Sequence, residues 1–240
     1  MIELSDSVVI IPTYNERENA ERMTRKVMSL EKDFHILFVD DGSPDGTADI
    51  IKELMTEFPG RIFIEERSGK LGLGTAYIHG FKWAIAKKYD FIFEMDCDFS
   101  HDPDDLIRLY NACAVDGADF SIGSRYTKGG KVKDWPLNRI LMSYFASIYV
   151  RMILWINIKD TTAGFKCYQR KVLESLNLDA NSFKGYAFQI LMKFSALRKG
   201  FKAKEVPITF IDREYGDSKM STSIFKEAFI GVWKMRGMKV

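Results

Sequence analysis

The chain has 240 residues, of which 46% are hydrophobic, 13% aromatic and 28% charged, and this is enough apolar material for a full core. Disordered, collagen-like and disulfide-stapled proteins are therefore excluded. Its 3 cysteines lack C-x-x-C spacing, which argues against a thiolate zinc site and favours a reducing cytoplasm. The net charge of +2 hides a division, since residues 1–120 hold 13 Lys or Arg against 24 Asp or Glu and residues 121–240 hold 22 against 9. An acidic half can bind a cation, and a basic half can meet phosphates or an anionic membrane.

The first half of the chain alternates short apolar runs with amphipathic stretches. This pattern predicts an α/β fold, with βαβ units around a mainly parallel sheet. The expected strands are 8–11, 36–39, 62–65, 91–95 and 120–122, and the expected helices are 17–30, 44–58, 75–88 and 104–115. Ser43 is expected to cap the second helix, with Pro44 at its first position.

The second half contains two long apolar helices, one predicted from residue 137 to about 156 and one from Ser223 onward. In the first, polar side chains recur at every fourth position and form one narrow stripe: Arg139, Ser143, Ser147 and Arg151. A helix that is otherwise apolar is either enclosed in the core or lies on a membrane. Because Arg151 interrupts the run, a membrane span is not expected. The C-terminal helix, amphipathic and basic with Trp233, either closes the core or contacts an interface.

Polar segments follow three of the predicted strands, at residues 12–16, 40–46 and 96–98. In open parallel α/β sheets, ligands bind beyond the carboxyl ends of the strands. Asp96 and Asp98 are two residues apart, which places both carboxylates on one side of an extended chain. Mg²⁺ or Mn²⁺ takes one or two such carboxylates and completes its shell with water and phosphate oxygens. A D-x-D segment alone is also typical of a solvated turn, so the neighbouring motifs carry the argument.

Two further features are less specific. The glycine-rich segment 69–74 lacks the G-x-x-x-x-G-K-[ST] spacing of a phosphate loop, and we expect a flexible loop at the start of the third helix. The three histidines, His35, His79 and His101, show no metal-ligand spacing. His101 follows the D-x-D segment, and we expect it to support that loop rather than to take part in catalysis.

Together these motifs resemble the family-2 glycosyltransferases of the GT-A fold, and the resemblance covers nearly the whole chain. The segments most similar to the polyprenol-phosphate (dolichol-phosphate) mannosyltransferases are 10–16, 39–47, 95–101, 123–126, 129–130, 162–165 and 218–219. The resemblance implies a Rossmann-like, mainly parallel sheet with helices on both faces and C-terminal amphipathic helices. It also implies one glycosyltransferase domain over residues 1–240, in which 1–125 bind the nucleotide sugar and 126–240 face the acceptor lipid. Ser100 departs from the relatives that have a metal-contacting Gln at this position.

The resemblance also implies roles for individual residues. The nucleotide would be bound by Pro12, Tyr14, Glu16, Val39, Asp41, Lys70 and Asp96. The metal would be held by Asp96 and Asp98. The catalytic residues would be Asp98, Arg125 and Arg139, and the acceptor phosphate would meet Arg125, Arg139, Arg213 and Lys219. Arg is suited to these positions because it clamps a phosphate with two hydrogen bonds.

The implied reaction is the inverting transfer of mannose from GDP-mannose to a polyprenyl or dolichyl monophosphate, with Mg²⁺ or Mn²⁺ and without nucleic acid. A phosphate monoester is largely ionised at neutral pH, so this acceptor needs no dedicated general base. The expected location is the cytoplasmic face of a membrane, with peripheral attachment or a membrane-protein partner. Two alternatives stay open: transfer of another sugar, such as glucose from UDP-glucose, to the same lipid, or a non-catalytic nucleotide-sugar-binding protein of this fold.

Overall fold

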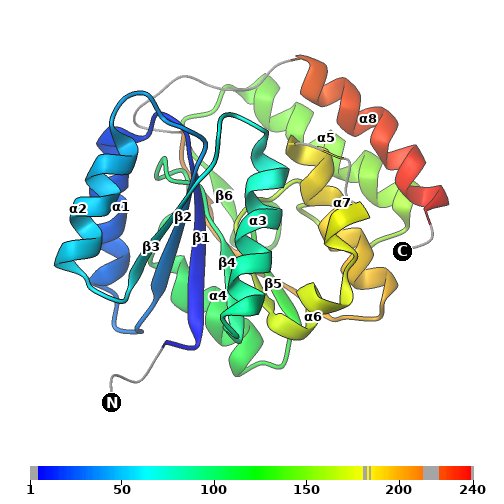
Figure 1. Ribbon diagram of the computed structural model, residues 1–240. Coiled ribbons are helices and arrows are strands. Elements are labelled where there is room, and N and C mark those ends of the chain that lie inside the picture. The colour runs from blue at the N-terminus through cyan, green and yellow to red at the C-terminus, as the bar shows by residue number, and fades with distance from the viewer. Residues whose placement is uncertain (1–4, 181–182, 184, 213–221, 239–240) are drawn as a thin grey trace.

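The computed structural model describes residues 5–180, 183, 185–212 and 222–238. Within these residues, seven strands form one sheet in the order β3-β2-β1-β4-β7-β5-β8 (Figure 1). The strands are β1 (Ser7–Thr13), β2 (His35–Asp40), β3 (Ile62–Glu66), β4 (Phe91–Glu94), β5 (Phe120–Ser124), β7 (Lys166–Gln169) and β8 (Ala203–Pro207). The short strands β6 (Lys131–Val132) and β9 (Thr209–Phe210) pair separately.

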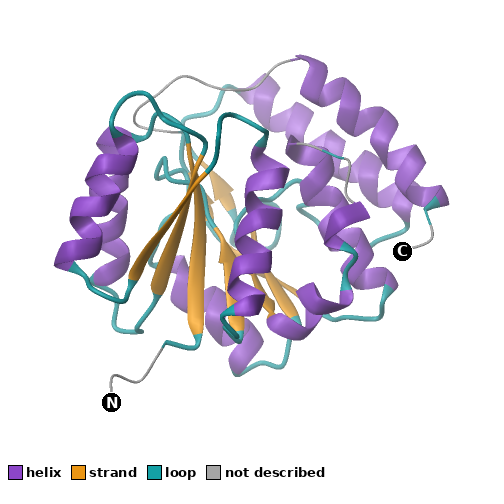
Figure 2. Cartoon of the chain, in the orientation of Figure 1, coloured by secondary structure: helices purple, strands orange, loops and turns teal. Residues whose placement is uncertain are grey.

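Helices cover both faces of the seven-stranded sheet (Figure 2). They are α1 (Arg17–Met28), α2 (Thr47–Glu57), α3 (Leu73–Ala86), α4 (Asp105–Ala114), α5 (Leu137–Leu154), α6 (Arg170–Ser175), α7 (Gly185–Arg198) and α8 (Thr222–Gly237), with a short 3₁₀ helix at Leu178–Ala180. The expected fold class is thereby confirmed, including helices on both faces of the sheet.

Strand β1 shows why the sheet has an apolar core on each face, since successive side chains of a strand point to opposite sides. Val8 and Ile10 pack with residues of α3, α6 and α7. Val9 and Ile11 pack with residues of α1, α2 and α4 on the other face. A strand buried on both faces reads as a continuous apolar run, which is how β1 appears in the sequence.

Strand β7 is the exception in a mainly parallel sheet. It lies antiparallel between β4 and β5, whereas β1 runs parallel to both β2 and β4, β2 to β3, and β5 to β8. The apolar runs of the sequence did not predict β7, because the charged residue Lys166 begins it. The strand has a consequence for the site: its start, rather than its end, lies beside the carboxyl end of β4, where Lys166 pairs with Glu94.

Helix α2 begins at Thr47, so the prediction that Ser43 caps it and that Pro44 is its first residue was wrong. Ser43 instead donates from its backbone N and its Oγ to the carboxylate of Asp40, over 2.8 and 2.6 Å. These bonds hold the segment after β2 in a turn. The N-cap is Gly46, with a φ of 87°, a conformation that favours glycine.

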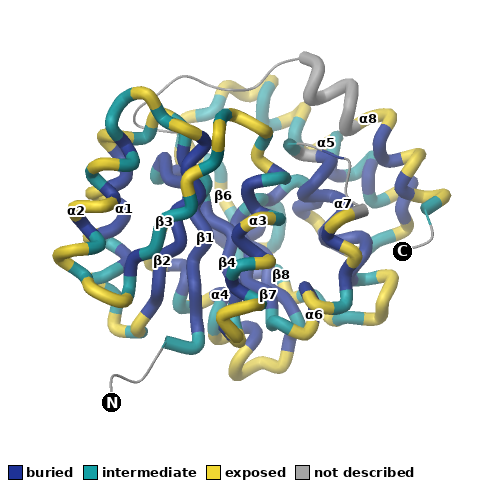
Figure 3. The backbone as a smooth tube through the Cα atoms, viewed as in Figure 1, coloured by how far each residue is buried: buried dark blue, intermediate teal, exposed yellow. Residues whose placement is uncertain are grey.

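Helices α5 and α8 form a third apolar cluster with α7. Val150, Ile153 and Leu154 of α5 are buried against Val232 and Met235 of α8 and against residues of α7. The C-terminal helix therefore does close part of the core. From residue 229 onward, this helix carries both buried and exposed residues (Figure 3).

The outer sides of the same two helices are apolar and exposed, so α5 is not enclosed in the core. We call this surface the α5–α8 apolar face, and its residues are Leu137, Leu141, Phe145, Met152, Trp155, Phe229, Ile230 and Trp233. The rings of Tyr149 and Phe229 stack with centroids 4.6 Å apart and join the two helices. None of the helices in the described residues combines the length and the apolar character needed to cross a bilayer.

Candidate active site

A cavity of about 500 Å³ opens at the carboxyl ends of β1, β2, β4 and β5. Among the residues expected at a nucleotide, metal or phosphate site, those that line it are Pro12, Tyr14, Glu16, Asp41, Lys70, Asp96, Asp98, Arg125 and Arg139. Val39 is a residue of β2 that is fully buried in the core, and it does not line the cavity. Arg213 and Lys219 lie outside the described residues.

The carboxyl ends of β1 and β2 form one end of the cavity. Asp40 organises this end, because its carboxylate accepts a hydrogen bond from Thr13 Oγ1 over 2.9 Å as well as those from Ser43. Asp41 is nearly buried and accepts from Arg67 Nε over 2.6 Å. Lys70 Nζ lies 4.9 Å from the ring centroid of Tyr14. A flat aromatic side chain, a carboxylate and a cation are thus brought together from three separate loops.

The two D-x-D carboxylates follow β4 and face the same cavity. The Tyr77 hydroxyl donates to Asp96 Oδ1 over 3.2 Å, and the backbone N of Ser100 donates to Asp98 Oδ1 over 3.1 Å. Burial next to Asp96 raises the pKa of Tyr77 well above its ordinary value, so Tyr77 stays a neutral donor. Both aspartates are therefore fixed in place by neighbouring donors.

These residues fit a hard divalent cation. The described part of the chain holds no group of three or more His, Cys, Asp or Glu side chains that could bind a metal ion. The carboxylates of Asp96 and Asp98 line the cavity together. Mg²⁺ and Mn²⁺ accept such oxygen ligands and take their remaining ligands from water and phosphate. The donor set therefore suits a cation that arrives with a phosphorylated ligand.

His101, directly after the acidic loop, is packed against two aromatic rings. It is fully enclosed, its ring stacks on Phe165 with centroids 5.0 Å apart, and it meets the Phe210 ring edge-on at 5.3 Å. Burial lowers the pKa of His101 to about 4, although the Asp98 charge acts in the opposite direction. The imidazole is therefore neutral at pH 7.

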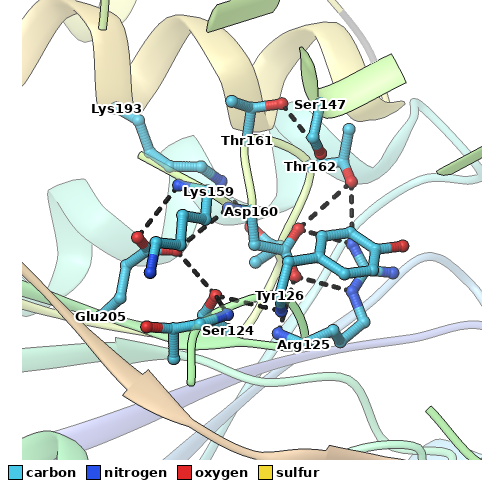
Figure 4. A network of polar contacts seen from close by, with 12 residues as sticks. Ser124, Arg125, Tyr126, Ser147, Lys159, Asp160, Thr161, Thr162, Lys193 and Glu205 are labelled. Carbon is cyan, nitrogen blue, oxygen red and sulfur yellow. Dashed lines mark hydrogen bonds and ion pairs between the residues drawn. The ribbon is translucent and has the colours of Figure 1, made fainter. Parts of the chain in front are cut away.

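Arg125, just after β5, is held by a buried ion pair (Figure 4). Its Nε and Nη2 donate to the two carboxylate oxygens of Asp160 over 2.7 and 2.6 Å, and Nη2 also donates to Thr162 Oγ1 over 2.8 Å. Burial acts to raise the pKa of Asp160, but the charge and hydrogen bonds of Arg125 outweigh burial and lower it. Arg125 is thus a fixed cation in the wall of the cavity.

The loop that carries Asp160 is itself tied to β8 (Figure 4). Glu205 accepts hydrogen bonds from the backbone N atoms of Lys159 and Asp160 over 2.9 and 3.0 Å, and from Ser124 Oγ over 2.7 Å. Ser124 directly precedes Arg125. One carboxylate therefore joins the end of β5 to the loop that orients Arg125.

Arg139, in the first turn of α5, is the second cation of this wall. Its guanidinium lies 3.8 Å from the ring centroid of Trp135 and donates to Asp212 over 3.1 Å. The guanidinium of Arg125 lies 5.6 Å from the same Trp135 ring. The two arginines thus share one aromatic neighbour, and both line the cavity with the D-x-D carboxylates.

Residues 8–176 match the family model described as glycosyl transferase family 2. The chain belongs to this family. It is 47% identical over 233 residues to a polyprenol monophosphomannose synthase of Mycolicibacterium smegmatis, covering 96% of this chain and 88% of that protein. It is 44% identical over 225 residues to an undecaprenyl-phosphate mannosyltransferase of Micrococcus luteus, covering 94% of this chain and 91% of that protein.

A solved structure confirms the fold of this family-2 glycosyltransferase. It is a mannosyltransferase of Pyrobaculum calidifontis in complex with GDP-mannose and Mn²⁺, with a TM-score of 0.61. The match has 14% sequence identity and covers 98% of this chain and 70% of that one. The family membership and the GT-A-like architecture expected from the motifs are therefore confirmed.

Several residues of this glycosyltransferase site were not singled out from the sequence: Trp135, Asp160, Gln189, Phe210 and Asp212. All five lie in the second half of the chain, where mainly loops and helices line the cavity. The sequence did hold one local signal of a buried polar group: Glu94 and Lys166 are charged residues among apolar neighbours. A charge in such a place predicts a buried partner.

Proposed function

We propose that the chain transfers mannose from GDP-mannose to a polyprenyl monophosphate, with Mg²⁺ or Mn²⁺ as cofactor. The observation that carries this proposal is a single cavity lined by the carboxylates of Asp96 and Asp98 and by the cations Arg125 and Arg139. The names of the two relatives support the lipid phosphate acceptor. The mannosyltransferase solved with GDP-mannose and Mn²⁺ supports the donor and the metal.

The proposal divides the single domain into two parts. Residues 1–125 bind the nucleotide sugar, with Tyr14, Asp41 and Lys70 at the nucleotide and the D-x-D carboxylates at the diphosphate. Residues 126–240 face the acceptor, with Arg139 at its phosphate. A divalent cation on Asp96 and Asp98 would neutralise charge on the diphosphate that leaves. The acidic and basic halves of the sequence thus correspond to donor and acceptor.

In the reaction, an oxygen of the acceptor phosphate forms a bond to the anomeric carbon of mannose while the bond from that carbon to the GDP oxygen breaks. Attack from the opposite face inverts the configuration, and the ionised phosphate has no proton to lose. The chain has to hold two anions close together. Arg125 and Arg139 reduce this repulsion in a preorganised way, because neighbouring residues already fix both guanidinium groups.

The α5–α8 apolar face is the part of the chain that we propose meets the membrane surface. It follows the acceptor end of the cavity along the chain, because Trp135 and Arg139 line the cavity and α5 begins at Leu137. Lys234 and Arg236 are exposed in the last turns of α8, where they can meet anionic headgroups. A prenyl chain could then reach the cavity along apolar side chains.

The direct test is to incubate the protein with GDP-[¹⁴C]mannose, Mg²⁺ and a short-chain polyprenyl phosphate and to count the label in the organic phase. The proposal expects label that disappears with EDTA. If label reaches the organic phase only from radioactive UDP-glucose, the acceptor assignment stands and the donor assignment is wrong. No label from either donor, with GDP binding intact by calorimetry, would favour a non-catalytic nucleotide-sugar-binding protein.

A further inference from the structure

A buried polar cluster lies beside the cavity, formed by Glu94 of β4, Lys166 of β7 and Gln189 of α7. Glu94 and Lys166 are directly opposite each other in the β4–β7 ladder, with Lys166 Nζ 3.0 Å from Glu94 Oε1. Gln189 Nε2 donates to Glu94 Oε2 over 2.8 Å, and Gln189 Oε1 accepts from Lys166. Glu94 and Lys166 are 0% exposed and Gln189 is 3% exposed, yet Gln189 lines the cavity.

The ion pair fixes the orientation of the Gln189 amide. The nitrogen must face the carboxylate and the oxygen must face the ammonium group, because the reversed amide would place donor against donor and acceptor against acceptor. Within the described residues, the second N–H of Gln189 has no protein acceptor. Next to it is Gly164, where an added Cβ would lie 3.7 Å from Gln189 Nε2. The glycine therefore leaves the amide uncovered on that side.

The order of the strands shows which part of a ligand would meet this amide. Along the edge of the sheet, β1 carries the nucleotide end of the cavity, β4 carries Asp96 and Asp98, β7 follows, and β5 carries Arg125. Gln189 contacts the β4–β7 pair and so lies between the proposed diphosphate and acceptor-phosphate positions. In a transferase, the group between these two phosphates is the sugar that moves.

We infer that Gln189 hydrogen-bonds the hydroxyl groups of the transferred hexose and helps to select that sugar, an inference that rests on the proposed function. The second N–H of this neutral amide is a donor without charge, which suits the oxygen of an uncharged hydroxyl group. Glu94 and Lys166 act as positioning residues, since they hold the amide in one orientation. A site built to bond particular hydroxyls discriminates against a sugar whose hydroxyls point elsewhere.

The test is Gln189→Met, which keeps the length of the side chain and removes the amide. Calorimetry gives the dissociation constants of GDP and GDP-mannose, and steady-state assays give kcat/KM for GDP-mannose and GDP-glucose. The loss of a hydrogen bond to the sugar should weaken the binding of GDP-mannose about tenfold relative to the binding of GDP. The ratio of kcat/KM for GDP-mannose to kcat/KM for GDP-glucose should fall by a similar factor. The affinity for GDP itself should stay within about twofold.

Gln169→Met is the matched control. Gln169 Nε2 donates to the carbonyl oxygens of Cys113 and Ala118, and Gln169 does not line the cavity, so this variant removes a partly buried, hydrogen-bonded amide without touching the sugar position. The ratio of its dissociation constants for GDP and GDP-mannose should match that of the wild type, and so should its preference for GDP-mannose over GDP-glucose. If Gln189→Met binds both ligands as the wild type does, or loses both equally, the inference is wrong.

Gln189→Asn provides a second variant in case Gln189→Met does not fold. It keeps an amide but withdraws it by one methylene, and the same loss of sugar preference is expected. A folded Gln189→Asn protein with wild-type preference would overturn the inference. The wild-type arm tests the proposed function separately: wild-type protein that transfers no mannose refutes the donor assignment, whatever the Gln189 variants do.

Discussion

Arg125 and Asp160 are 35 residues apart in the chain, yet the guanidinium of one and the carboxylate of the other meet in a bidentate pair with distances of 2.7 and 2.6 Å. The pair is almost completely buried, with side-chain exposures of 6% and 0%. Removing one member of such a pair leaves the other as an uncompensated buried charge.

Asp160→Asn should therefore both destabilise the protein and misplace Arg125. We expect the free energy of unfolding to fall by about 3–5 kcal/mol, measured by urea denaturation, and kcat for mannosyl transfer to fall as well. Glu57→Gln is the control, because it disrupts the exposed pair with Arg25 and should barely move the urea midpoint. Equal effects of the two substitutions would contradict a special role for the Arg125–Asp160 pair.

Lys166→Met should destabilise the protein for the same reason, because Glu94 would stay buried without its cationic partner. The double variant Glu94→Gln/Lys166→Met should recover part of the loss, since its remaining groups are neutral. Urea denaturation of the two single variants and the double variant completes a double-mutant cycle. Additive losses would show that the ion pair does not couple the two strands.

The stability of the fold should depend on pH partly through His35. The ring is buried and its Nδ1 lies 2.6 Å from the Tyr89 hydroxyl, and burial lowers the pKa of His35 below its ordinary 6.5. Below about pH 6.5 the unfolded state then binds a proton that the folded state does not, so stability decreases as the pH falls.

His35→Gln should remove this part of the pH dependence. The difference in unfolding free energy between pH 7.5 and pH 5.5 is the quantity to compare, because titrating carboxylates contribute alike to both proteins. A variant whose stability falls as steeply as that of the wild type would contradict the assignment to His35.

Arg139→Ala should act on the acceptor and not on the donor. Loss of a charged hydrogen-bond donor to the lipid phosphate should raise KM for polyprenyl phosphate by about 10- to 100-fold. The dissociation constant of GDP from calorimetry should be unchanged, because Arg139 is at the other end of the cavity from Tyr14 and Asp41. Weaker GDP binding in this variant would contradict the division of the cavity into a nucleotide end and an acceptor end.

The α5–α8 apolar face can be tested by liposome flotation. Phe145→Glu combined with Trp233→Glu should weaken binding to anionic vesicles by tenfold or more, because burial of each aromatic side chain contributes about 1.5–3 kcal/mol. Val115→Glu is the control, since Val115 is 75% exposed at the end of α4, outside this face. Wild-type protein that does not float, with or without Mg²⁺, would refute membrane contact.

The first half of the fold was predictable because its signals are local. Each buried parallel strand there is a short apolar run, and the polar residues after it necessarily meet at one edge of the sheet. That rule alone brings Asp41 and Asp96 together. The resemblance added roles for these residues, and it supplied Gly129–Gly130, for which the structure gives a reason: a Cβ on Gly130 would lie 2.5 Å from the carbonyl oxygen of Ser124.

The second half was less predictable because its contacts are not local. Asp160 has no pattern of its own, and only the folded chain brings it to Arg125. Gln189 is one of several polar residues in α7, and its sequence context is also that of a hydrogen-bonded core residue. The start of α2 was misplaced because Ser43, a favoured capping residue, bonds to the Asp40 side chain in the preceding turn.

The antiparallel direction of β7 has a consequence for engineering. A directed-evolution library that randomises the loops after the strands, where ligands of α/β proteins bind, would here cover the nucleotide and metal positions. It would miss the segment that precedes β7 and the facing turn of α7, where the proposed sugar contacts lie. A library restricted to Gly164 and Gln189 would be small enough to screen completely, and it could change which hexose is transferred while donor-nucleotide and lipid recognition stay intact.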